Sequence, residues 1–98
     1  MVWCVFRKSF LSEEERNACV PNVNDILVKG QYDYKFIDVT WSEQAEHETW
    51  KYLGELIVHH LDYLNDAFYY VCGYFSVDNP ENIVFNYHDL VNVTHNIG

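Results

Sequence analysis

The second half of this 98-residue chain lacks lysine and arginine altogether. Residues 1–51 contain nine acidic and six basic side chains, whereas residues 52–98 contain six acidic side chains and no Lys or Arg, so the two net charges are −3 and −6. Contacts with nucleic-acid phosphates or with an anionic membrane require basic side chains. The composition therefore argues against nucleic acid and membrane as partners. It favours a basic protein surface, which an acidic protein attracts over a distance.

Other absences exclude further classes of protein. The four glycines do not cluster, so there is no glycine-rich phosphate loop, and no apolar run is long enough to cross a bilayer. The first ten residues, MVWCVFRKSF, are apolar and then basic, which is the reverse of a secretory signal. We therefore expect a cytoplasmic protein, in the host cytoplasm if a phage encodes it.

The cysteines do not form a recognisable framework. Cys4, Cys19 and Cys72 are odd in number and have no CxxC spacing, so reduced, buried thiols are expected rather than disulfides. Their spacing with the five histidines supports no metal site. Cys4 and Cys72 lie in apolar segments that disfavour a thiolate, and Cys19 has no basic neighbour beyond Arg16. We predict no catalytic residue, no metal, no cofactor and no enzymatic activity.

The patterns that are present indicate a single domain, residues 1–98, of the α+β class. Strands are predicted at residues 1–10, 31–41, 67–77 and 83–93 from β-branched and aromatic residues and their alternation. The alternative for residues 67–77 and 83–93 is that they are helical. Ser12 begins a capping box for a short helix that ends before Pro21, and Asn24-Asp25 are expected to cap a second short turn. Residues 78–82 are expected to form a turn.

The longest regular segment is Ser42 to Asp66, predicted to be an amphipathic helix with Ser42 as N-cap. Its core-facing side is expected to contain Trp50, Leu53, Ile57, Leu61 and Leu64. The predicted order is therefore β-α-β-α-β-β. About four mostly antiparallel strands are expected to pack on this one long helix.

The opposite side of this helix has an acidic stripe, which we define as Glu48, Glu55, Asp62 and Asp66, bordered by Tyr52, His59 and Tyr63. This side of the helix is either a solvated face or, because no Lys or Arg interrupts the stripe, a binding surface. Four charges over about 27 Å of helix are much sparser than duplex DNA, with one charge per ~1.7 Å. One stripe cannot imitate a duplex. Asp78, Glu81 and Asp89 would have to extend it, or a homodimer would have to double it.

These observations favour a non-enzymatic inhibitor or binding protein. It would use an acidic, aromatic-rich surface to block a basic, nucleic-acid-binding site on a partner protein or nuclease. Alternatives are an immunity protein or antitoxin that neutralises a nuclease toxin, and a structural homo-oligomeric subunit. The composition resembles that of many anti-CRISPR, anti-restriction and immunity proteins, but these groups share no motif, so no functional residue follows from the resemblance. The predicted partner-binding residues are Glu48, Tyr52, Glu55, His59, Asp62, Tyr63, Asp66, Asp78, Glu81 and Asp89.

Overall fold

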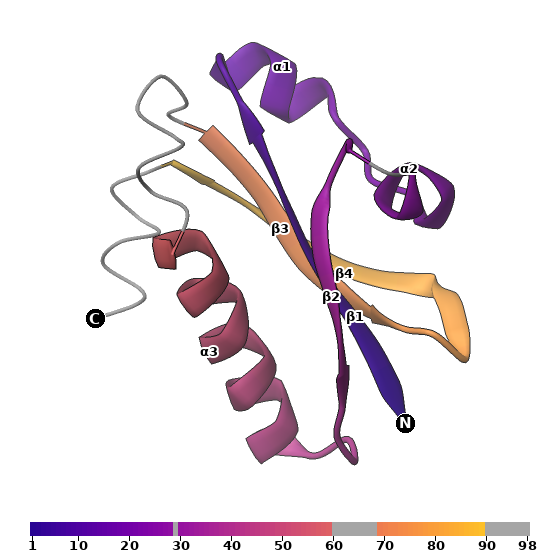
Figure 1. Cartoon of the computed structure of the whole chain (residues 1–98). Coiled ribbons are helices and arrows are strands. Elements are labelled where there is room, and N and C mark those ends of the chain that lie inside the picture. Colours follow the sequence, from indigo (N-terminus) through magenta and orange to yellow (C-terminus); the bar gives the residue numbers. More distant parts are fainter. Residues whose placement is uncertain (29, 60–68, 90–98) are drawn as a thin grey trace.

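The computed structural model describes residues 1–28, 30–59 and 69–89. Four strands form one antiparallel sheet in the order β2-β1-β3-β4. Helix α3 runs along one face of the sheet, and α1 and α2 lie near one end on the other side (Figure 1). This arrangement confirms the predicted α+β class and its antiparallel sheet. The elements are β1 (Val2–Phe10), α1 (Glu13–Ala18), α2 (Val23–Leu27), β2 (Asp33–Asp38), α3 (Glu43–His59), β3 (Tyr69–Ser76) and β4 (Asn79–Asp89).

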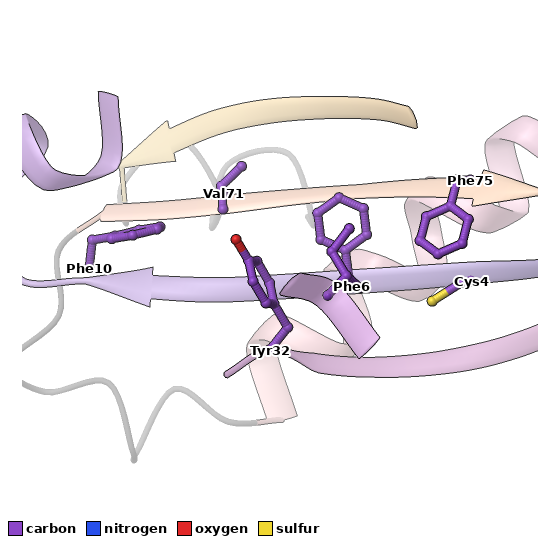
Figure 2. Close-up of a cluster of buried hydrophobic side chains, with 7 residues drawn as sticks. Cys4, Phe6, Phe10, Tyr32, Val71 and Phe75 are labelled. Atoms are coloured by element: carbon purple, nitrogen blue, oxygen red, sulfur yellow. The ribbon is translucent and has the colours of Figure 1, made fainter. Parts of the chain in front are cut away.

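The two central strands, β1 and β3, are apolar on both faces because both faces are covered. On the α3 face, Val5 packs with Leu53 and Ile57 of the helix and with side chains of β3. The other face holds a second cluster, in which Phe6 and Phe75 lie with Ile26 of α2 (Figure 2). Burying two layers on one sheet gives a short chain an extensive core. The second cluster comprises Cys4, Phe6, Phe10, Ile26, Tyr32, Val71 and Phe75.

The helix starts follow from local hydrogen bonding. The hydroxyls of Ser12 and Ser42 accept from the backbone amides of Glu15 and Ala45, each at 3.1 Å, as predicted for N-caps. The second helix was assigned the wrong cap. Asn22, with an extended backbone, accepts from the Asp25 amide at 2.9 Å, so α2 begins earlier than Asn24-Asp25 implied.

The long helix is described as far as His59, 17 residues in all, and the predicted continuation to Asp66, with Leu61 and Leu64, lies outside the described residues. Leu53 and Ile57 are buried and Trp50 is half-buried, which confirms that side as core-facing. None of the described helices is long and apolar enough to span a membrane.

The strand assignments for the last two segments are correct, but the turn between them is shorter than predicted. Only Val77 and Asp78 form the turn, and Asn79 and Pro80 already belong to β4. Proline lacks an amide hydrogen, but an edge strand leaves one side of its backbone unpaired and so tolerates it. Turn-type composition at residues 78–82 was therefore outweighed by pairing with β3.

The buried thiols predict loss of stability at alkaline pH. Burial raises the pKa of Cys4 and of Cys72 to about 12, from 9.0 in the unfolded chain. The unfolded state therefore releases these protons first, and stability present below pH 9 is lost as pH rises toward 12. Each thiol contributes about 1.4 kcal/mol per pH unit in that window. Urea unfolding measured between pH 9 and 12 should show the free energy of unfolding falling as pH rises. In a Cys4→Ala variant this free energy should fall less steeply. An unchanged slope in Cys4→Ala would contradict the assignment.

Candidate protein-binding surface

The described part of the acidic stripe lies on the outer side of α3. Glu48 and Glu55 are exposed, and Tyr52 is half-buried with the Lys35 ammonium 5.0 Å from its ring centroid. His59 is the last described residue of the helix. The predicted members Asp62, Tyr63 and Asp66 lie outside the described residues. The structure therefore places only half of the stripe's four acids.

Lys51 borders the described part of this stripe. It is exposed and helical, three residues after Glu48 and four before Glu55, which are the spacings at which helical side chains become neighbours. Lys51 therefore adds a positive charge at the border of the described part of the stripe. The described portion contains two acids and one base, a weak field for attracting a basic partner.

The acids of the β3–β4 hairpin do not form one group. Asp78 lies in the turn and Glu81 early in β4, both exposed, whereas Asp89 is half-buried at the far end of β4 opposite Tyr69. Glu81 and Asp89 are eight positions apart along the strand, about 27 Å when extended. Helix α3 packs on β1 and β3, whereas β4 is the edge strand beyond β3. Asp78, Glu81 and Asp89 therefore do not extend the acidic stripe as one continuous surface.

The structure assembles a different surface at the N-terminal end of α3. All three tryptophans of the chain meet there around Tyr74, and we call Trp3, Trp41, Trp50 and Tyr74 the tryptophan cluster. The Trp3 and Trp41 ring centroids are 4.5 Å apart, Trp41 is 5.7 Å from Tyr74, and Trp50 is 5.1 Å from Tyr74. Tyr74 is buried, Trp3 and Trp50 are half-buried, and Trp41 is 41% exposed. The exposed Trp41 indole therefore packs against the rings of Trp3 and Tyr74.

Different elements supply these rings. Trp3 projects from β1 and Tyr74 from β3 on the face that α3 covers, and Trp50 lies on the inner side of α3. Trp41 lies just before the cap residue Ser42, in the connection from β2. The alternation within the predicted strand at residues 31–41 places Trp41 on the same side as Ile37, which packs on the α3 face. It gave no indication that Trp3 and Tyr74 would meet it there.

Acidic groups border the tryptophan cluster. The Tyr74 hydroxyl donates to Glu46 Oε1 at 3.4 Å, and burial together with this carboxylate raises the Tyr74 pKa. Glu43 and Glu46 are exposed in the first turn of α3. Asp38, at the end of β2, is also exposed and lies 3.2 Å from the Met1 amine. This end of the molecule therefore presents aromatic area beside exposed carboxylates.

Basic groups, in contrast, are largely engaged within the protein. The Arg7 guanidinium is buried against Asp33, and the Arg16 guanidinium lies between 5 and 6 Å from two tyrosine rings. The ammonium groups of Lys8 and Lys35 lie 5.0–5.3 Å from aromatic ring centroids. Aromatic faces attract cations. Each of these four cations thus has a partner within the protein, and acidic side chains outnumber basic ones in the net charge of −9.

The described residues form no metal-ligand cluster, and two of the three cysteines are buried. Within residues 1–28, 30–59 and 69–89, no three His, Cys, Asp or Glu side chains lie close enough to hold a metal ion. Cys4 and Cys72 are buried thiols with raised pKa values, which makes them poor nucleophiles. No family model, curated protein or solved structure matches the chain.

Proposed function

We propose that this chain is a non-enzymatic binding protein that uses an acidic, aromatic-rich surface to block a basic, nucleic-acid-binding site on a partner protein. Anti-CRISPR and anti-restriction proteins would be examples of such an inhibitor. The observation that supports this function best is the tryptophan cluster beside Glu43 and Glu46. The centre of the proposed surface is thus the N-terminal end of α3 rather than the middle of the stripe.

The chemistry of the tryptophan cluster suits a basic partner. Tryptophan and tyrosine dominate binding hot spots because they supply large contact area with few rotatable bonds. The Trp41 indole is already packed on two rings, so little of its freedom remains to be lost on binding. An arginine or lysine of the partner can stack on this indole while Glu43 or Glu46 accepts its hydrogen bonds. Both interactions favour a cation over an apolar group.

Charge reversal at this surface should slow association with the partner. The partner would be captured from host lysate at low salt, released at high salt, identified, and shown to bind nucleic acid. We expect Glu43→Lys/Glu46→Lys to lower its association rate about tenfold at low salt, because electrostatic steering acts mainly on this rate. Glu48→Lys/Glu55→Lys should have a smaller effect, since Lys51 already reduces the charge there. Trp41→Ala should instead speed dissociation.

Stopped-flow or biolayer measurements at several ionic strengths would check these effects. The nucleic acid of the captured partner should compete with the chain for the partner. If neither reversal changes the rate or its salt dependence, the acidic surface does not bind the partner. If nucleic acid and the chain bind together, the proposed blocking mechanism is wrong. A toxin as the captured partner would assign the chain as an immunity protein.

A further inference from the structure

Strand β2 forms one edge of the sheet and pairs only with β1 in the described part of the chain. The opposite edge, β4, contains Pro80 and an irregular register between Tyr74 and Ser76, and both features discourage pairing with another strand. The sequence of β2, DYKFID, contains no proline, and its pairing with β1 runs without a register shift. The two edges therefore differ, and β2 is the one open to a further strand (Figure 1).

The charged residues of β2 do not oppose the pairing of another strand at this edge. Edge strands commonly carry charged side chains, especially lysine, which oppose pairing. Here Asp33 binds Arg7, Asp38 lies beside the Met1 amine, and the Lys35 ammonium lies over the Tyr52 ring on α3. Each charge is thus held by another part of the same protein. What remains on the strand is its backbone and two aromatic rings.

These two rings, Tyr34 and Phe36, share the face of the sheet that α3 does not cover. Their register partners Phe6 and Cys4 lie in the cluster on that face. Tyr34 is 38% exposed and Phe36 is 49% exposed, with their ring centroids 5.7 Å apart. The backbone edge and the exposed aromatic area therefore occur at the same place.

We propose that β2 pairs antiparallel with β2 of a second copy of this chain, forming a continuous eight-stranded sheet across a two-fold axis beside Phe36. An axis perpendicular to the sheet keeps each face on the same side, so one residue must lie opposite its own copy. With Phe36 on the axis, Tyr34 faces Asp38 and Lys35 faces Ile37, so no like charges are opposed. With Lys35 on the axis, two ammonium groups would face each other. Of these two registers, only the one with Phe36 on the axis avoids opposing like charges.

The rest of the fold leaves room for this pairing. Helix α3 packs mainly on β1 and β3, and α2 contacts β2. In the dimer the two α3 helices lie on the same face of the joined sheet, which doubles the acidic surface. This inference does not depend on the proposed function. Each copy has a net charge of −9, so salt should strengthen the dimer by screening repulsion, whereas salt should weaken binding to a basic partner.

Cysteine cross-linking tests the register. Cys4 lies opposite Phe36 on β1, so the full chain would first receive Cys4→Ala to prevent a bond within one copy. Phe36→Cys should then give a covalent dimer on mild oxidation, because directly opposed residues have Cα atoms about 4.5–5.5 Å apart, within disulfide range. Tyr34→Cys should not, because its two copies would be four residues, about 14 Å, apart along the strands. Cross-linking of Lys35→Cys but not Phe36→Cys would overturn the register.

Sedimentation velocity over a range of concentrations tests the interface with the native cysteines in place. Phe36→Asp should weaken dimerisation at least about tenfold, because two carboxylates would be placed directly opposite each other. Val84→Asp, a matched change of an exposed residue on β4, should not. Circular dichroism would confirm that both variants are folded. A chain that stays monomeric at every concentration and salt, or one whose dimer is lost in Val84→Asp alone, would refute the proposal.

Discussion

Gly73→Ala is expected to lower the free energy of unfolding by about 3 kcal/mol or more, a large share of the 5–15 kcal/mol typical of a domain. A Cβ atom at Gly73 would lie 2.1 Å from the carbonyl oxygen of Val84, 2.8 Å from Phe85 Cα and 2.8 Å from Phe6 Cζ. Two of these three atoms belong to the backbone of β4. They cannot move away without separating β4 from β3, so the substitution strains the centre of the sheet.

Gly30→Ala provides a matched control for this prediction. Gly30 has a φ of +90°, but nothing lies within 4 Å of an added Cβ. Its replacement should therefore cost only the backbone strain, about 1–2 kcal/mol. Urea unfolding of the two variants, followed by circular dichroism, would compare a steric clash with a conformational cost. A Gly73→Ala variant as stable as Gly30→Ala would show that the sheet relaxes around the methyl group.

Gly73 also shows what local patterns can and cannot predict. A glycine is unfavourable inside a helix, and β3 occupies Tyr69–Ser76 of the predicted strand at residues 67–77. The main role of Gly73 depends on contacts far away in the chain, because Phe6 of β1 and Phe85 of β4 lie directly opposite it. The Phe6 ring lies beside β3 between Val71 and Phe75 (Figure 2). Periodicity identifies strands, but it does not reveal which strands become neighbours.

The same limit applies to the candidate surface. The helix wheel correctly placed Trp50, Leu53 and Ile57 toward the core, because that face depends only on spacing along one helix. The tryptophan cluster depends on β1 lying between β2 and β3, so that Trp3, Trp41 and Tyr74 meet. The charge pattern predicts the acidic stripe, but nothing in it places Glu46 beside an aromatic ring from β3.

Asp33→Ala is expected to destabilise the protein by about 3–5 kcal/mol, although Asp33 itself is a largely exposed residue. The reason is its partner. The Arg7 side chain is 3% exposed, whereas that of Asp33 is 60% exposed, and the two form an ion pair between β1 and β2. Arg7 Nε has no further hydrogen-bond partner among the described residues. Burial lowers the Arg7 pKa and Asp33 opposes that shift, so removing Asp33 leaves a buried charge without compensation.

The reciprocal change should be far milder, and this asymmetry makes the prediction specific. Arg7→Met removes the buried charge, keeps a side chain of similar length in the core, and leaves Asp33 in water, so we expect a loss of about 1 kcal/mol or less. Arg7→Met/Asp33→Ala should then be more stable than Asp33→Ala alone. Asp33→Asn, which keeps an oxygen acceptor, should lie between wild type and Asp33→Ala. Chemical denaturation of the four variants and the wild type measures all of these differences in the free energy of unfolding.

If Asp33→Ala costs less than about 1 kcal/mol, the pair behaves as an ordinary surface salt bridge and Arg7 must reach water. If it costs the larger amount, Asp33 is what allows β2 to lie against a buried cation. That result also bears on the edge of the sheet. A β2 strand anchored by Arg7 at one end and by the Met1 amine at the other is held flat against β1. Asp33→Ala should then loosen β2 and weaken its pairing with a second copy, even though Asp33 opposes no charged residue there.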